Sequence, residues 1–322
     1  MALTNKNITV HIGMPKSAST TIQRYFMSGL QDIHYFGAED FSEGSRLFLQ
    51  ILNQDGLRFN ANKNEQALEE NIDQTKPVIF SSEFACGLRC PLLSGQVQSS
   101  STICERLYDV APQAKILIIL RNQFDLQKSF HAQLLKKEST FLDIDKFTLD
   151  SWMEKNINLH NQHWPSVFDF ADYFSLVELY QSKFENVHVV LFEEIIKDME
   201  SFVNDDLFNF MQLEKKHVRS PFVNKVENIR YDTSNIKVND LINKVSNILK
   251  KRFGNPFGKV DKDQKERLIS NIIHISGKIF PGKRYTQYDR KHELFIHDFY
   301  KNSNQQLAEL LNKDLSKFGY PV

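Results

Sequence analysis

Several features that mark whole classes of proteins are scarce in this 322-residue sequence. Its 12 glycines and 9 prolines are too few for a collagen-like rod or a low-complexity linker. Its three cysteines, Cys86, Cys90 and Cys104, are an odd number and form no disulfide framework. They also lack the second cysteine pair or the well-placed histidine of a zinc site. We therefore expect no bound metal and a reducing compartment, most simply the cytoplasm.

Long apolar runs and an excess of one charge are missing as well. No stretch approaches the ~18 apolar residues that a membrane-spanning helix needs, and residues 1–10 lack the basic and apolar regions of a signal peptide. The 40 basic and 40 acidic side chains cancel, whereas proteins that coat nucleic acids are usually basic. We expect a cytoplasmic protein with no transmembrane segment and no nucleic-acid partner. The sequence carries no signal for its oligomeric state.

Four short apolar runs alternate with stretches of helical periodicity. The runs at 8–12, 78–80, 115–120 and 187–192 are rich in β-branched residues, which is typical of parallel strands buried on both faces. Helical patterns cover 20–27, 124–137, 167–184, 238–251, 262–275 and 294–318. This alternation predicts an α/β fold with a central parallel sheet flanked by helices. We interpret 1–322 as a single domain with a helical C-terminal elaboration, and 31–74 as loops with one helix.

The first apolar run leads into Gly13-Met14-Pro15-Lys16-Ser17-Ala18-Ser19-Thr20-Thr21, which reads as strand, tight turn and helix start. Such a turn binds anions, because the first amides of a helix lack internal partners and the helix dipole is positive there. Lys16 would add a full positive charge. The alternative is a plain helix start capped by Ser19 or Thr20, but capping does not call for a lysine.

A nucleoside triphosphatase loop has the pattern G-x-x-x-x-G-K-[ST] and is longer than this one. Here Lys16 follows Gly13 by only three residues, and no apolar run ends in the aspartate that commonly helps to hold magnesium. These departures disfavour a kinase or an ATPase.

The segment Pro15–Gln23 closely resembles the 5′-phosphosulfate loop of sulfotransferases that use 3′-phosphoadenosine 5′-phosphosulfate (PAPS). Bacterial members have roughly P-K-[ST]-G-[ST]-T-x-[LI]-Q. The resemblance implies a P-loop-type fold and assigns donor binding to Lys16, Ser17, Ala18, Ser19, Thr20 and Thr21. Ala18 departs from the usual glycine, which raises the cost of a positive φ. We expect the loop to tolerate alanine if the position is helical.

A second motif follows the third apolar run. Arg121, Asn122, Asp125 and Ser129 are similar to the family's 3′-phosphate motif, R-[ND]-P-x-[DE]-x-x-x-S-x-Y, although Gln123 replaces the proline. An arginine at a strand end and a serine eight residues later can converge on one phosphate. Taken alone, they read equally well as a surface arginine and an ordinary helical serine. Asn304–Ala308 and Gly319–Pro321 resemble the final helix and tail of bacterial members.

The third part of the predicted site is Glu83, which follows the apolar run 78–80, the run that carries no donor motif. A catalytic histidine or glutamate often follows this strand in the family, so Glu83 resembles the general base by position. The alternative is an exposed or capping glutamate. His131 is the second candidate, whereas we interpret His11, His160 and His163 as structural and Glu193-Glu194 as complements of a helix dipole.

A short basic turn at 281–285 also has a family counterpart. Heparan-type sulfotransferases carry a somewhat similar loop that closes over the nucleotide, which suggests the same role for Lys283 and Arg284. A solvated basic turn is an equally good interpretation.

Together these features predict a PAPS-dependent sulfotransferase that releases the 3′,5′-bisphosphate (PAP) and acts by in-line displacement, with Glu83 as base and Lys16 stabilising the leaving phosphate. The resemblance favours a carbohydrate or glycolipid acceptor, but tyrosine, lipid and natural-product hydroxyls stay open. We expect 31–74 and 214–292 to shape the acceptor site. The alternatives are a nucleotide-binding relative without transfer activity and an ATP-dependent small-molecule kinase.

Overall fold

The computed structural model describes residues 7–37, 42–73, 75–83, 85–87, 98–138, 148–163, 166–214 and 288–322. Among these, one compact unit holds the residues up to Leu126, 159–214 and 296–322, and the other holds 127–158 and 288–295. The single-domain interpretation stays a prediction. The helices expected at 238–251 and 262–275 lie outside the described residues, as do Lys283 and Arg284.

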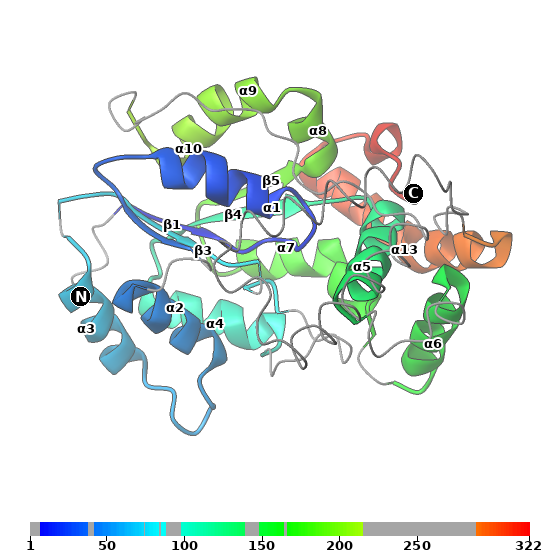
Figure 1. Ribbon diagram of the computed structural model, residues 1–322, viewed down its shortest axis with the longest axis horizontal. Helices are drawn as coiled ribbons and strands as arrows, with labels where there is room; N and C mark the ends of the chain where they lie inside the picture. Colours follow the sequence, from blue (N-terminus) through cyan, green and yellow to red (C-terminus); the bar gives the residue numbers. More distant parts are fainter. Residues whose placement is uncertain are drawn as a thin grey trace, which may run out of the picture. The chain divides into compact units, whose positions relative to one another are not determined.

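The first unit is built on a five-stranded sheet in which all paired strands are parallel (Figure 1). Its spatial order is β2 (His34–Gly37), β3 (Val78–Ser81), β1 (Ile8–His11), β4 (Lys115–Leu120) and β5 (Val187–Leu191). The α/β, P-loop-type fold with a central parallel sheet between helices is therefore confirmed. β1 lies in the middle, so both of its edges are hydrogen-bonded.

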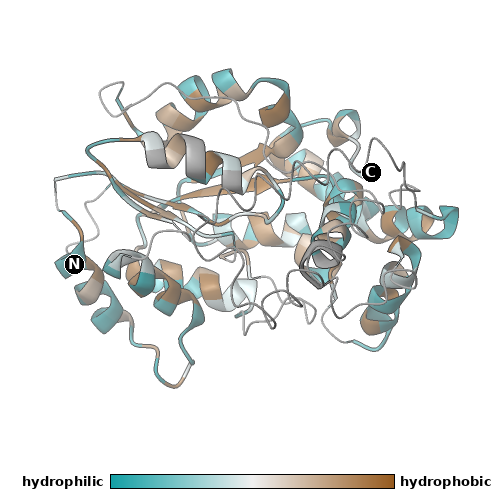
Figure 2. Cartoon of the chain, viewed as in Figure 1, coloured by the Kyte–Doolittle hydropathy of each residue, from teal (hydrophilic) through white to brown (hydrophobic). Residues whose placement is uncertain are grey.

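The strands are mostly apolar, as expected for a parallel sheet with both faces covered, and their polar residues lie mainly at the strand ends. All four residues of β1 and of β3 and all six of β4 are buried, and Figure 2 shows these strands as hydrophobic. The four strands predicted from the sequence are present. β2 was missed, because its sequence, His-Tyr-Phe-Gly, lacks the β-branched residues that mark the other strands.

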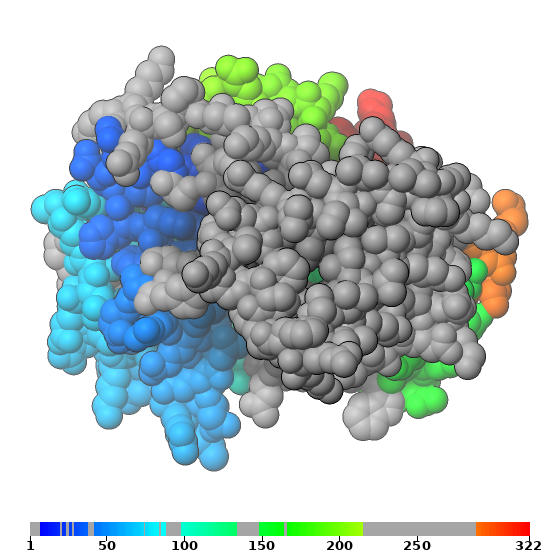
Figure 3. All heavy atoms as spheres, viewed as in Figure 1, coloured from blue at the N-terminus to red at the C-terminus, as the bar shows by residue number. Residues whose placement is uncertain are grey.

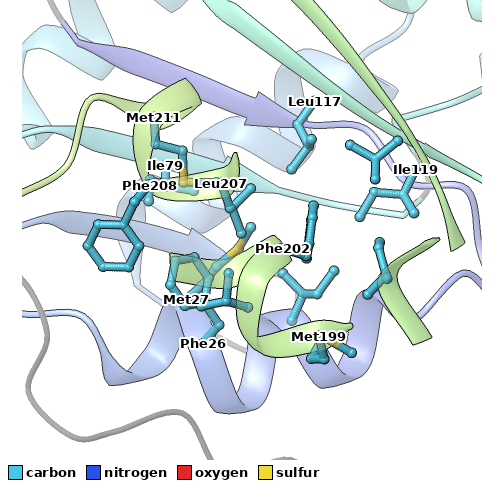
Figure 4. Packing of buried hydrophobic residues seen from close by; sticks show 14 residues of the cluster. Phe26, Met27, Ile79, Leu117, Ile119, Met199, Phe202, Leu207, Phe208 and Met211 are labelled. Carbon is cyan, nitrogen blue, oxygen red and sulfur yellow. The ribbon is translucent and has the colours of Figure 1, made fainter. Parts of the chain in front are cut away.

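One face of the sheet is covered by a helical run that follows β1 and by the helices after β5 (Figure 1). The first run comprises α1 (Ser19–Thr21), the π-helix η2 (Ile22–Phe26) and η3 (Met27–Gly29). The second comprises α8 (Phe192–Lys197), α9 (Met199–Ser201), the π-helix η5 (Phe202–Leu207) and α10 (Phe208–Met211). Phe26 and Phe208 meet edge to face, 5.6 Å apart, in the core between them (Figure 4).

The other face is covered by α2 (Glu43–Asn53), α3 (Ala61–Asn71), α4 (Ser100–Val110) and α7 (Tyr173–Gln181) (Figure 1). The 3₁₀ turns η4 (Asp169–Ala171) and η7 (Leu315–Phe318) complete the described elements of this unit. The segment 31–74 thus contains a strand and two helices, and the expectation of loops with one helix is wrong. Ser42 and Asn60 cap α2 and α3 by accepting hydrogen bonds from backbone amides three residues on.

Three further helices are α5 (Gln123–Glu138), α6 (Leu149–Asn161) and α13 (Arg290–Leu311), and the division between the units falls within each of them. In the second unit, His292 lies between two carboxylates of α6, 2.9 Å from Asp150 and 3.2 Å from Glu154. Lys291 pairs with Glu154 as well. These side-chain contacts connect the first turn of α13 to α6.

The order of the strands points to the place where a ligand would bind. From β1 the chain continues to β2 and β3 on one side, and then crosses to β4 on the other side. Ligands of open parallel sheets bind beyond the carboxyl ends of the strands at such a reversal. The residues that follow β1 and β4 are those of the two phosphate motifs.

Candidate active site

The turn after β1 has an unusual backbone with three left-handed residues, Gly13 (φ 95°), Lys16 (φ 67°) and Ala18 (φ 61°). Hydrogen bonds to β4 hold its start, from the Met14 amide to the Ile119 carbonyl (2.9 Å) and from the Ile119 amide to the Gly13 carbonyl (2.9 Å). Left-handed conformations are costly for residues other than glycine, and a cluster of them in one turn is typical of ligand-binding loops. The turn is therefore a built feature and not a simple link between strand and helix.

The helix that follows begins without a side-chain cap among the described residues. Its N-cap is Ala18, whose carbonyl accepts the first intrahelical hydrogen bond from the Ile22 amide (3.0 Å). The Ser19 hydroxyl instead donates backward to the Met14 carbonyl (3.1 Å). The amides of Ser19, Thr20 and Thr21 thus have no intrahelical acceptor. This arrangement suits an anion and not the plain capped helix that we considered as the alternative.

Ser17 provides a second sign of a ligand. Its side chain is fully buried, yet its hydroxyl has no hydrogen-bond partner among the described residues. Buried polar groups are nearly always paired, so an exception calls for an explanation. A bound oxyanion would accept a hydrogen bond from this hydroxyl. Lys16 next to it is half-buried and can offer its charge to the same ligand.

The condition under which we expected alanine at position 18 to be tolerated is not met. The condition was a helical backbone, but Ala18 is left-handed, with φ 61° and ψ 9°. It occupies the conformation for which the family's glycine is suited, and its Cβ makes that conformation less favourable. The strain is a local cost of this chain's loop.

Ala18→Gly is therefore expected to stabilise the protein by about 0.5–1 kcal/mol, since removal of the Cβ strain outweighs the added freedom of the unfolded chain. The control is Ala67→Gly, in the middle of α3, where glycine should destabilise by about 1 kcal/mol. Denaturant unfolding of both variants measures the two changes. Destabilisation by both would show that Ala18 is not strained.

The backbone of Glu83 lies directly against this turn. A Cβ placed on Gly13 would lie 2.9 Å from the Glu83 Cα and carbonyl oxygen. The cause is the parallel pairing of β1 and β3, in which His11 is opposite Ser81, so that the chain after both strands leaves the same edge. Cys86 donates to the Glu83 carbonyl (3.2 Å). The backbone of Glu83 therefore lies beside the turn after β1, and its side chain is half-buried, while its role as the base stays a prediction.

Gly13→Ala is expected to destabilise the protein by about 2 kcal/mol or more, because φ is 95° and the new methyl group would overlap the Glu83 backbone. Gly56→Ala is the matched control, since nothing lies within 4 Å of a Cβ there. The free energy of unfolding should change little in the control. Equal losses in both variants would contradict the close approach of the two chain segments.

Arg121 joins the two predicted phosphate motifs. Its Nη1 donates to the Lys16 carbonyl (2.6 Å), and its guanidinium lies 4.5 Å over the ring of Phe192. The Arg121 carbonyl accepts from the Tyr173 hydroxyl (2.7 Å). Only 8% of the residue is exposed. The structure therefore brings the first and second turns together, as the motif order predicted, and shows a cation held in place from several sides.

Asn122 completes the second turn with three hydrogen bonds. Its Oδ1 accepts from the Asp125 amide (2.9 Å), as an N-cap of α5 does. Its amide and Nδ2 both donate to Oε1 of Glu193 (2.9 Å each). Burial raises the pKa of Glu193, while these hydrogen bonds and Arg121 oppose that rise. The dipole interpretation of Glu193 missed this contact, although a carboxylate after a neighbouring parallel strand was the signal for it.

Several predicted site residues are not brought together by the structure. Ser129 is half-buried in α5 and belongs to the other compact unit than Arg121, so their convergence on one phosphate stays a prediction. Lys283 and Arg284 lie outside the described residues. His131, the second candidate for the base, is buried near the ring of Trp152, with 6.0 Å between centroids.

His11, the last residue of β1, belongs to a group of buried and half-buried polar side chains. Its Nδ1 is 2.8 Å from the Ser81 hydroxyl, which also accepts from Gln23 Nε2 (2.8 Å). Burial lowers the pKa of His11 from 6.5 to about 4, so the ring is neutral at pH 7. This agrees with its interpretation as a structural residue.

Acidification should therefore destabilise the fold through His11. Between pH 6.5 and 4 the unfolded chain binds a proton at this residue that the folded chain does not, so stability falls by up to about 3 kcal/mol. The loss begins below the unfolded pKa and levels off below the folded one. Unfolding of wild type and His11→Gln at pH 7 and pH 4.5 measures it. An equal pH dependence of the two proteins would contradict the assignment.

The described residues contain no cluster of three His, Cys, Asp or Glu side chains that could hold a metal ion. In the same part of the chain, no helix has both the length and the apolar character to cross a membrane.

Comparisons with known proteins identify the fold. No protein-family model matches the chain, and no curated protein sequence matches it significantly. Among solved structures, the chain is similar to the crystal structure of a sulfotransferase from Alicyclobacillus acidocaldarius, with 18% identity and a TM-score of 0.55. The alignment covers 98% of this chain and 98% of the other. At this level of identity, the likeness shows that the two proteins share a fold.

Proposed function

We propose that this protein is a sulfotransferase that transfers the sulfuryl group of PAPS to an acceptor hydroxyl of a carbohydrate or glycolipid. The observation that carries the proposal is the left-handed turn Gly13–Ala18, which contains the buried Ser17 hydroxyl and leads into an uncapped helix start. Arg121 holds this turn through the Lys16 carbonyl. The shared fold with a sulfotransferase supports it. In a sheet of this topology, the turn lies where ligands bind.

The residues suit the two charged ends of the donor. Lys16, the Ser17 hydroxyl and the amides of Ser19–Thr21 would hold the 5′-phosphosulfate, because each offers a positive charge or a donor. Arg121 would hold the 3′-phosphate together with Ser129. Lys283 and Arg284 are proposed to close over the nucleotide. Since Lys16 and the helix start provide the positive charge, we expect donor binding to require no magnesium.

PAPS supplies an activated sulfuryl group, and the chain supplies alignment and proton transfer. Glu83 is proposed to take the proton of the acceptor hydroxyl as the acceptor oxygen bonds to sulfur. The bond from sulfur to the bridging oxygen breaks, and its electron pair leaves with the 5′-phosphate of PAP. Lys16 stabilises the negative charge that builds on that oxygen. Alignment of the two oxygens on opposite sides of sulfur lowers the entropic part of the barrier.

The acceptor is proposed to be a glycan or glycolipid hydroxyl in the cytoplasm, reached through a cleft shaped by 31–74 and 214–292. In the first of these segments, α2 and α3 and the turn between them lie on the visible face in Figure 3.

Transfer of labelled sulfate from PAPS to a panel of acceptors tests the function. We expect label on glycans or glycolipids, and none on the same glycans after complete O-methylation, which removes the hydroxyls. Label only on tyrosine peptides, lipids or natural products would keep the reaction and change the acceptor. PAP binding without transfer to any acceptor would favour a non-catalytic relative, and phosphate transfer from ATP would favour a kinase.

A further inference from the structure

Glu193, in the first turn of α8, carries a carboxylate that links parts of the sheet unit far apart in sequence. One oxygen, Oε1, accepts two hydrogen bonds from Asn122, from its backbone amide and from its side chain (2.9 Å each). The other, Oε2, accepts from the hydroxyl of Tyr320, two residues before the last residue, Val322 (3.4 Å). All three residues lie in the same compact unit.

The C-terminal tail is attached to the second turn at another point as well. Asn304 Nδ2 donates to the Pro321 carbonyl (2.7 Å), and Gln123 Nε2 donates to Asn304 Oδ1 (2.9 Å). Gln123 directly follows Asn122, and both Gln123 and Asn304 are fully buried. Tyr320 is 4% exposed. Asn122 is thus held by Glu193, whose carboxylate also binds Tyr320, and Gln123 is held by Asn304.

The neighbouring carboxylate, Glu194, is engaged elsewhere. It accepts from the Leu191 amide (3.3 Å) and pairs with Lys313 Nζ (2.6 Å). It stands in the same helical turn as Glu193 and is also linked to the C-terminal part of the chain, but these contacts do not involve the second turn. The chain therefore contains a matched internal control for the effect of losing a carboxylate at the start of α8.

We propose that Glu193 is a positioning residue that holds Arg121 ready for the 3′-phosphate, with Tyr320 orienting its carboxylate. The proposal rests on the proposed function, in which Arg121 binds that phosphate. Two donors of Asn122 on one carboxylate oxygen restrain the peptide group that follows Arg121. A restrained arginine loses less conformational freedom when it binds a phosphate, so the nucleotide binds more tightly.

The experiment measures the dissociation constant of PAP by calorimetry on the full chain, together with thermal unfolding without ligand. Glu193→Gln keeps the side-chain shape and one acceptor oxygen but removes the charge. We expect Glu193→Gln to raise the dissociation constant of PAP about tenfold, the size typical of losing one charge-assisted hydrogen bond. Tyr320→Phe should weaken binding about threefold, and Glu194→Gln should leave it unchanged.

A double-mutant cycle separates positioning from a general loss of stability. If Glu193 acts through Arg121, then Glu193→Gln should have less than about a threefold effect in an Arg121→Lys background. Effects that multiply in the cycle would overturn the proposal, as would equal weakening by Glu193→Gln and Glu194→Gln. Should Glu193→Gln fail to fold, the same cycle with Tyr320→Phe decides the question.

The failure of this proposal differs from the failure of the proposed function. Wild type that does not bind PAP would refute the proposed function and with it this role of Glu193. Wild type that binds PAP, with Glu193→Gln and Tyr320→Phe binding equally well, would refute only the positioning role. The donor KM should rise in Glu193→Gln while kcat changes little, a split that a purely structural residue would not produce.

Discussion

Lys16→Ala is expected to lower the rate of sulfuryl transfer by about 10²–10³-fold, the effect typical of removing one group that stabilises developing charge. Lys16 lies in the left-handed turn after β1, and its carbonyl is held by Arg121 at 2.6 Å. Negative charge builds on the bridging oxygen as the bond to sulfur breaks, so the lysine should matter more in the transition state than in the bound donor. Initial rates with saturating PAPS and acceptor measure the change.

The controls for Lys16 use the same backbone position and an unrelated lysine. Lys16→Arg keeps the charge and should recover part of the rate, whereas Lys16→Met keeps the length without charge and should not. Lys301→Ala removes an exposed lysine of α13, outside both proposed acceptor segments, and should leave the rate unchanged. Wild-type kcat in Lys16→Ala would remove Lys16 from the mechanism.

Glu83→Gln is expected to lower kcat by about 10²–10⁴-fold and to leave the affinity for PAP unchanged. Glutamine has nearly the same shape but cannot take the acceptor proton. The Glu83 backbone packs against Gly13, so the Glu83 side chain leaves the backbone next to the turn after β1. Single-turnover rates with bound donor measure the chemical step apart from donor binding. Glu309→Gln, on the exposed side of α13, is the control for loss of a carboxylate.

The outcome that contradicts the base assignment also points to the replacement. If Glu83→Gln retains the wild-type rate and His131→Asn lowers it 10²-fold or more, the histidine of α5 is the base. If neither substitution lowers the rate, proton removal does not limit the reaction through either residue.

The sheet was predictable because its strands are buried on both faces, which leaves a continuous apolar signal in the sequence. β1, β3 and β4 are buried throughout and β5 over its last three residues, whereas β2 has the sequence His-Tyr-Phe-Gly, which contains no β-branched residue. The positions of both phosphate motifs were predictable as well, because each motif directly follows an apolar run in the sequence. Parallel strands leave the sheet at one edge, so residues after β1 and β4 meet.

Contacts between distant segments were less predictable. The position of Glu193 after a strand next to β4 indicates that it lies near the second turn, but not that its carboxylate accepts from Asn122, 71 residues earlier, or from Tyr320. The conformation of Ala18 was likewise left open by the sequence, because a short-range pattern does not distinguish a helical N-cap from a left-handed one. Both features depend on how the turns pack against each other, which only the folded chain determines.

The most direct test of the account is the thermal stability of wild type with two nucleotides. The turn after β1 and Arg121 are built, in this account, for a 3′,5′-bisphosphate and a phosphosulfate without magnesium. PAP in the absence of magnesium should raise the melting temperature, and ATP with magnesium should not. Stabilisation by ATP with magnesium, without any effect of PAP, would contradict the account and favour a kinase.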